Sequence, residues 1–139
     1  MNKNYVALKN YPHVTANLPD LALLSRYAQD SIEGLPENFK ALACNLTVKV
    51  ENFADQETLT SLNIKDKYDL LGLYRGVPVP VKALQPNLTL PDVIFLYRCP
   101  LIRYSRENNE SLEVLVHHVM LHEMGHHFGY TDFEMGWFK

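Results

Sequence analysis

Hydrophobic and polar residues alternate along the chain with two different periods, and each period predicts a different kind of element. Between residues 19 and 33, apolar residues recur every three or four positions, which is typical of an amphipathic helix. Asp20 is expected in the first turn of this helix and Gly34 just beyond its end. The following residues, 35–40, predict a turn that includes a short helical segment.

Three segments have the patterns of β-strands. Residues 45–51 alternate between apolar and polar side chains, as a half-buried strand does. Residues 70–76 are apolar, contain two glycines and predict a short strand followed by a tight turn. Residues 93–97 are β-branched and aromatic, which favours a strand that Pro100 should end.

The segments between these strands give weaker patterns. Residues 54–62 predict one or two helical turns that carry Leu59 and Leu62. Two prolines in 77–81 argue against a central strand, so we expect an edge or a loop there. Residues 86–92 are expected to form a further loop, and residues 1–18 to be irregular.

The last long helix should begin near Ser111, which is a suitable N-cap residue. Its apolar stripe comprises Leu112, Leu115, Val116 and Val119, and the same stripe continues into His122 and His126. We therefore expect the histidine-bearing face of this helix to point into the body of the protein.

This helix carries the motif H-E-x-x-H, formed by His122, Glu123 and His126. Residues four apart on a helix share one face, with Cβ atoms roughly 6 Å apart, so both imidazoles reach a single zinc ion. Glu123 projects beside them as the candidate general base. A polar, histidine-rich helix end is the alternative interpretation, and the additional residues of the motif favour the metal site.

A third ligand is predicted downstream of the pair. Gly129 is suited to a left-handed turn that ends the helix and directs the chain back toward the metal. Asp132 follows three residues later and completes the string H-E-x-x-H-x-x-G-x-x-D. Three protein ligands with one open position are typical of catalytic zinc, whereas structural zinc has four protein ligands.

Other polar residues near the motif have weaker predictions. We interpret His118 as a packed residue or one that supports the ligands, and His117 and His127 as solvent-facing. His127 and Tyr130 are nevertheless the candidate donors to an oxyanion, because they are near the motif in sequence. Arg75 and Arg98 are candidates for binding a substrate carboxylate or backbone, and surface salt bridges are the equal alternative.

Composition places the chain among ordinary globular proteins. The 139 residues predict one domain, of which 47% is hydrophobic and 21% charged. A net charge of −3 shows no basic excess, so we expect no nucleic-acid partner, and no segment is apolar enough to predict a membrane span or signal peptide. Cys44 and Cys99 form no C-x-x-C pair and predict free thiols in the cytoplasm. The sequence carries no signal for an oligomeric state.

Three stretches resemble the small bacterial zincin-like metallopeptidases, also described as minimal metalloproteases. These stretches are Gly-Leu-Tyr-Arg-Gly-Val-Pro at 72–78, the segment 90–98, and the zinc motif at 122–132, and they occur in the family's order. The resemblance extends over residues 35–135. Cys99 departs from the family pattern, in which a glycine is expected after Tyr97 and Arg98.

The resemblance implies a zincin-like α+β fold, in which a small mixed sheet packs on a C-terminal active-site helix. It also implies that His122, His126 and Asp132 bind one Zn²⁺ per chain, with Glu123 catalytic. The expected function is then hydrolysis of a peptide or protein substrate. A zinc-binding regulatory or interaction module with little turnover is the main alternative. A metal-dependent RNA-processing hydrolase is a second alternative, which the glutamate and the absence of basic excess disfavour.

Overall fold

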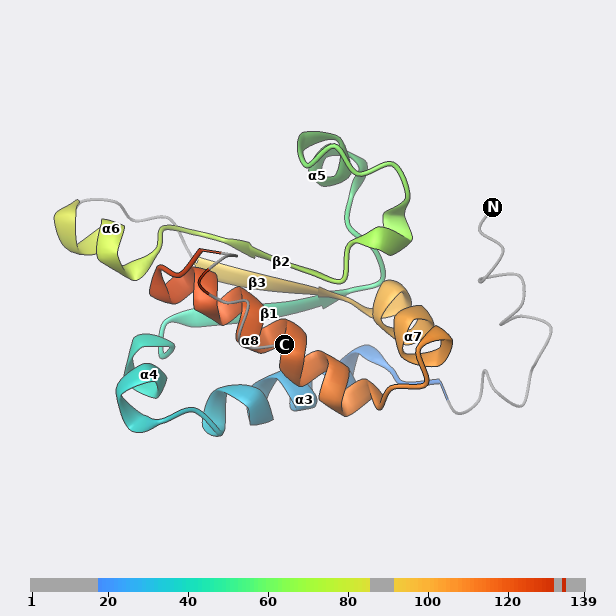
Figure 1. The fold of residues 1–139 in the computed structure, drawn as a ribbon, viewed down its shortest axis with the longest axis horizontal. Helices are drawn as coiled ribbons and strands as arrows, with labels where there is room; N and C mark the ends of the chain where they lie inside the picture. The colour runs from blue at the N-terminus through green and yellow to red at the C-terminus, as the bar shows by residue number, and fades with distance from the viewer. Residues whose placement is uncertain (1–17, 86–91, 132–133, 135–139) are drawn as a thin grey trace.

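Three strands form a small mixed sheet in the computed structural model, which describes residues 18–85, 92–131 and 134 (Figure 1). The central strand, β3 (Asp92–Tyr97), runs parallel to β1 (Leu46–Glu51) and antiparallel to β2 (Gly72–Arg75). Within the described residues β2 pairs only with β3, so β2 is an edge strand. All three strands fall where the sequence pattern predicts them.

Helices surround this sheet. In chain order they are α3 (Leu21–Glu33), α4 (Glu37–Leu42), α5 (Gln56–Ser61), the short 3-10 helix η1 (Lys67–Asp69), α6 (Val79–Leu84), α7 (Arg98–Glu107) and α8 (Leu112–Phe128). Helices α3 and α8 lie side by side on one face of the sheet, where α3 packs against β1 and α8 packs against β2 and β3 (Figure 1). The chain therefore has the predicted α+β fold, with its last described helix against the sheet.

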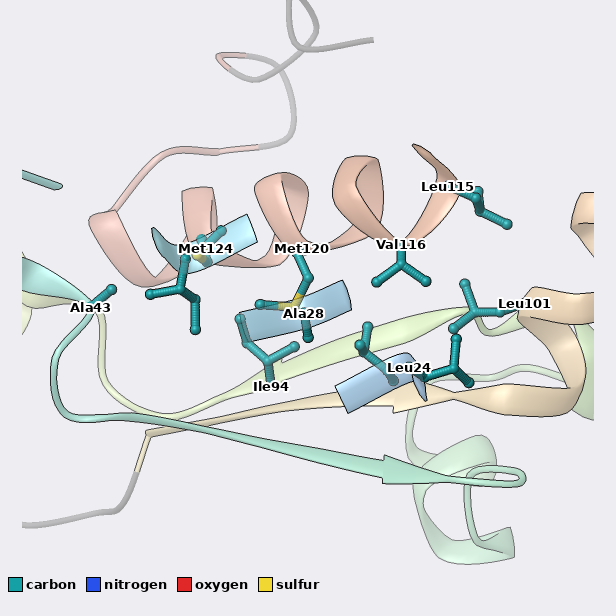
Figure 2. Close-up of a cluster of buried hydrophobic side chains, with 11 residues drawn as sticks. Leu24, Ala28, Ala43, Ile94, Leu101, Leu115, Val116, Met120 and Met124 are labelled. Atoms are coloured by element: carbon teal, nitrogen blue, oxygen red, sulfur yellow. The ribbon is translucent and has the colours of Figure 1, made fainter. Parts of the chain in front are cut away.

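The main hydrophobic core lies between the sheet and these two helices (Figure 2). Ile94 of β3 points toward this layer, near Met120 and Met124 of α8 and Leu24 of α3 (Figure 2). Leu96 of β3 belongs to the same cluster. All five side chains are fully buried. Each such burial stabilises the fold by about 1.5–3 kcal/mol, so this layer fixes the position of α8 on the sheet.

A second, smaller core covers the opposite face of β3. Phe95 and Tyr97 alternate with Ile94 and Leu96 along the strand, so they point away from α8. They pack with Leu59 of α5 and with neighbouring apolar residues. The helical turns predicted for residues 54–62 are confirmed by α5, in which Leu59 is buried, whereas Leu62 follows the end of the helix and is exposed.

Two of the α-helices were not predicted, and both contain a proline in the first turn. Residues 79–84 form α6, not the expected edge or loop, and Pro80 lies in its first turn. Pro100 does follow the end of β3, but it lies within the first turn of α7. The first amide groups of a helix have no partner within the helix, so a proline there removes no hydrogen bond.

The ends of the other predicted helices agree with their capping residues. Asp20 is the N-cap of α3, not a residue of its first turn, and its Oδ1 accepts a hydrogen bond from the Leu23 amide at 2.8 Å. Ser111 caps α8 by accepting from the Val114 amide at 3.4 Å.

No helix in the described part of the chain is both long and apolar enough to cross a membrane. The expected irregular segment 1–18 lies almost entirely outside the described residues, as do residues 86–91 of the expected loop.

Candidate metal centre

Helix α8 carries both histidines of the motif on one face. The ring centroids of His122 and His126 lie 5.0 Å apart, with the ring planes at 86°. Both side chains are half-buried, as is that of Glu123 between them. The buried stripe of α8 runs instead through Val116, Met120, Met124 and His127. The expectation that the His122–His126 face points into the protein body was therefore wrong, and this face lies at the margin of the core.

A hydrogen bond at the end of α8 sets the tautomer of His126. Its Nδ1 lies 3.2 Å from the carbonyl oxygen of Tyr130. A carbonyl only accepts hydrogen bonds, so Nδ1 is the donor, and in the tautomer with one ring proton Nε2 has the lone pair. Histidines that bind metals commonly use one ring nitrogen as the ligand while the other donates to a carbonyl or carboxylate. The contact of Nδ1 with the Tyr130 carbonyl therefore leaves Nε2 as the ring nitrogen of His126 that is suited to bind a metal.

The donor set is compatible with zinc. Two imidazole nitrogens on adjacent helical turns are common zinc ligands, and the half-exposed face leaves access for further ligands. Asp132, the predicted third ligand, lies outside the described residues. Among the residues that are described, no three His, Cys, Asp or Glu side chains are grouped to hold a metal ion. The described part of the site thus contains two of the three predicted ligands and the predicted general base.

The turn after α8 has the predicted left-handed conformation. Gly129 has φ +100°, and its amide donates to the His126 carbonyl at 3.0 Å. The Tyr130 amide donates to the Gly125 carbonyl at 2.9 Å. These two bonds form a Schellman motif, which ends the helix and reverses the direction of the chain. This left-handed conformation of Gly129 is the one that the sequence analysis predicts for a turn back toward the metal.

His127 differs most from its prediction. It is 2% exposed, not solvent-facing, because it follows Met120 and Met124 on the buried face of α8. Its Nε2 lies 3.0 Å from the Leu42 carbonyl and its Nδ1 lies 3.0 Å from the Tyr74 hydroxyl. Burial lowers the pKa of His127, so the ring is neutral near pH 7. With both nitrogens engaged inside the protein, His127 is unsuited to stabilise an oxyanion.

The other histidines of α8 lie outside the core. His118 is exposed, and its Nδ1 lies 3.5 Å from Glu110 Oε1, so the prediction of a packed or ligand-supporting residue was wrong. His117 is exposed as expected, and its Nδ1 lies 3.1 Å from the Ser31 hydroxyl on α3. Both side chains lie at least one helical turn before His122.

The two candidate arginines make structural contacts. Arg75 donates to the Thr58 hydroxyl at 2.8 Å and lies 5.7 Å from the ring of Phe95, on the face of the sheet away from α8. Arg98 donates through Nε to the Pro19 carbonyl at 2.6 Å, which fixes the start of α3. These contacts lie away from the histidine site, and with the acids that the structure describes neither arginine makes the salt bridge that was the alternative prediction.

Two cavities flank the end of α8. One, of about 590 Å³, lies between His126 and the segment that connects β2 to α6, with Pro78 and Pro80 in its wall. The other, of about 250 Å³, is almost entirely apolar and lies between α4 and α8, lined by Phe39 and Phe128 among others. Tyr130 borders both cavities and is exposed.

A buried polar cluster next to the site was not predicted. Asp92, at the start of β3, is 3% exposed and accepts hydrogen bonds from the Val77 amide at 3.0 Å and from Lys82. The Tyr74 hydroxyl lies 3.1 Å from Asp92 Oδ1 and also contacts His127. Burial raises the pKa of Tyr74 to about 12, so its hydroxyl keeps its proton. The only sequence signal was that Tyr74 and Asp92 lie in the stretches that resemble a known family.

A small mixed sheet with an edge strand beside a helix that carries H-E-x-x-H defines the zincin class of proteins. The sequence model of the zincin-like metallopeptidases matches residues 43–137, and the chain therefore belongs to the zincin-like metallopeptidase family. Members of this family are typically zinc-dependent. No curated protein matches the chain.

Proposed function

We propose that this protein is a zinc-dependent peptidase, in which His122, His126 and Asp132 hold one zinc ion and Glu123 is the general base. The observation that carries the proposal is the pairing of two half-buried imidazoles, 5.0 Å apart, on the helix face that also presents Glu123. Membership of the zincin-like metallopeptidase family supports the assignment.

Zinc, when bound, supplies a water of lowered pKa and polarises a carbonyl group. Glu123 directly follows His122 on the helix and accepts the proton that the attacking water loses. The same carboxyl group then returns the proton to the amine that leaves. Tyr130 is the candidate donor to the developing oxyanion, because it is exposed beside His126 and borders both cavities.

The surroundings of the site support a peptide as the substrate. Strand β2 is the edge of the described sheet and packs against α8, so its outer N–H and C=O groups are placed to pair with an extended chain. The 590 Å³ cavity beside His126 provides a second, partly apolar surface along such a chain. No strong basic patch is needed for this substrate, in keeping with a net charge of −3. The free thiols of Cys44 and Cys99 fit the proposed cytoplasmic location.

A zinc-binding module with little turnover is the alternative, since it would use the same ligands. Glu123→Gln separates the two functions, because glutamine has nearly the same shape but does not accept the proton. We expect the zinc-loaded wild type to cleave members of a mixed peptide library, as detected by mass spectrometry, and Glu123→Gln to lose at least a hundredfold in rate while keeping its zinc. Glu113→Gln, on the exposed first turn of α8, is the matched control and should cleave as the wild type does. Equal cleavage by Glu123→Gln and wild type would refute the mechanism.

A further inference from the structure

The Tyr74 hydroxyl connects three parts of the fold at the end of α8. It lies 3.1 Å from Asp92 Oδ1, at the start of β3, and 3.0 Å from His127 Nδ1, in the last turn of α8. His127 Nε2 continues the chain of contacts to the Leu42 carbonyl at the end of α4. Edge strand, central strand, ligand helix and α4 are therefore linked through a single tyrosine and a single histidine.

The Tyr74 hydroxyl is a donor that Asp92 Oδ1 and His127 Nδ1 share. The Leu42 carbonyl only accepts, so His127 Nε2 carries the ring proton and Nδ1 is an acceptor. Tyr74 has one hydroxyl proton for two acceptors, Asp92 and His127. Tyr74 donates to Asp92 Oδ1, and its hydroxyl oxygen lies 3.0 Å from His127 Nδ1. Asp92 also accepts from the Val77 amide and from Lys82, so it keeps two donors when the shared proton turns to the histidine.

The space around the Tyr74 hydroxyl is closely packed. A Cβ atom on Gly76 would lie 2.8 Å from the hydroxyl oxygen and 2.1 Å from Asp92 Oδ1, and Gly76 has φ +156°. The rings of Tyr74 and His127 are also in edge contact, with centroids 5.4 Å apart. The hydroxyl thus has little freedom to move, and the imidazole that it contacts is held in one orientation.

This contact bears on the metal site because His127 directly follows His126. A rotation of the last turn of α8 would move His126 relative to His122, which lies one turn earlier on the helix. The opposite side of the same turn rests on α6, where Pro80 lies so close that a Cβ on Gly129 would be 2.6 Å from its ring. Lys82 of α6 also forms an ion pair with Asp92. The two contacts of the last turn, with Tyr74 and with α6, are therefore both connected to Asp92.

We propose that Tyr74 is a positioning residue, which acts through His127 to fix the last turn of α8 and hence the orientation of His126. The inference rests on the proposed zinc site for its functional meaning. The role is one of positioning and not of catalysis, because the contacts of the hydroxyl are with Asp92 and His127 in the buried cluster.

Tyr74→Phe tests the proposal, since it removes only the hydroxyl oxygen. In the metal-free variant we expect faster amide hydrogen exchange in the last turn of α8, residues 125–128, and unchanged exchange in its first two turns. Zinc affinity should fall about tenfold, as is usual when a group that orients a ligand is lost. The visible absorption of the cobalt-substituted site should change as well. Tyr27→Phe, which removes the same group from a half-buried tyrosine of α3, is the control and should change none of these.

A second variant distinguishes positioning from general loosening. His127→Gln keeps a donor for the Leu42 carbonyl but removes the ring that Tyr74 contacts. If Tyr74 acts through His127, the double variant should lose about tenfold in zinc affinity, as each single variant does, and not a hundredfold. Multiplying effects, or faster exchange spread evenly along α8, would overturn the proposal. If the wild type itself binds no zinc, the proposed function fails, while the exchange measurement alone still decides whether Tyr74 holds the helix end.

Discussion

Gly129→Ala should destabilise the protein more than any other exchange of a helix-capping glycine for alanine in the described chain. Gly129 has φ +100°, which is unfavourable for alanine because its Cβ approaches the following backbone. The added Cβ would also lie 2.6 Å from Pro80 Cγ and 2.9 Å from Pro80 Cδ. Both atoms belong to a ring that is joined to the backbone of α6, so the contact is not relieved by a change of rotamer.

These two effects give the expected magnitude. The left-handed conformation costs about 1–2 kcal/mol for alanine. Displacement of a packed ring costs a further amount of about 1–3 kcal/mol. The free energy of unfolding should therefore fall by about 2–5 kcal/mol, and zinc affinity should fall with it, because the turn at Gly129 leads from His126 toward Asp132.

Gly34→Ala is the matched control, because Gly34 ends α3 with φ −79° and its added Cβ would be 3.4 Å from the nearest atom, the Asp30 carbonyl oxygen. We expect this variant to be neutral or up to about 1 kcal/mol more stable than the wild type. Urea unfolding of the metal-free proteins measures both changes. Pro80→Ala, combined with Gly129→Ala in a double-mutant cycle, should recover the part of the loss that comes from the ring. The reasoning is refuted if the two glycine variants unfold within 1 kcal/mol of each other.

Two further predictions concern the core and the sheet. Met120→Ala should lower the free energy of unfolding by about 2–5 kcal/mol, because Met120 is fully buried at the centre of α8. Val114→Ala, at an exposed position of the same helix, is the control and should stay within about 0.5 kcal/mol of the wild type in the same urea titration. Burial raises the pKa of Tyr97 from 10 to about 12, so the unfolded chain loses this proton first as the pH rises. Stability should consequently be unaffected by this group below pH 10 and fall between pH 10 and 12. Tyr97→Phe should show a shallower fall over that range, and an identical slope in the two proteins would contradict the assigned cause.

The strands were predictable because their signals are local. Residues 45–51 alternate as a half-buried strand must, and 93–97 combine β-branched and aromatic side chains. Both ends of α8 could also be predicted, at Ser111 and at Gly129, because helix capping depends on only a few neighbouring residues. The same holds for the two-histidine motif, whose spacing on a helix is enough to place both rings on one face.

Helices α6 and α7 were not predicted, because proline was interpreted only as a residue that interrupts or ends a helix or strand. In both helices the proline lies in the first turn, where its missing amide has no cost. The orientation of α8 was misjudged for a different reason. Its apolar residues surround most of the helix, so sequence alone did not show that Met120, Met124 and His127 would face the sheet. That choice depends on contacts with β3 and α3, which are distant in sequence.

The buried cluster of Tyr74, Asp92 and His127 also depends on distant contacts. Its members come from the edge strand, the start of the central strand and the end of the last helix. Each residue considered alone resembles an ordinary surface polar group. Only the pairing of β2 with β3, and the packing of α8 across both, brings the three together.

The zinc content of the purified, untagged protein tests the central claim most directly. Elemental analysis should find about one zinc per chain in the wild type and in His118→Ala, whose exposed side chain lies one helical turn before His122. His126→Ala should retain little zinc under the same conditions, because it loses one of two ligands on α8. A wild type that carries no zinc and takes up none when it is added would contradict the account, as would equal zinc in His126→Ala and His118→Ala.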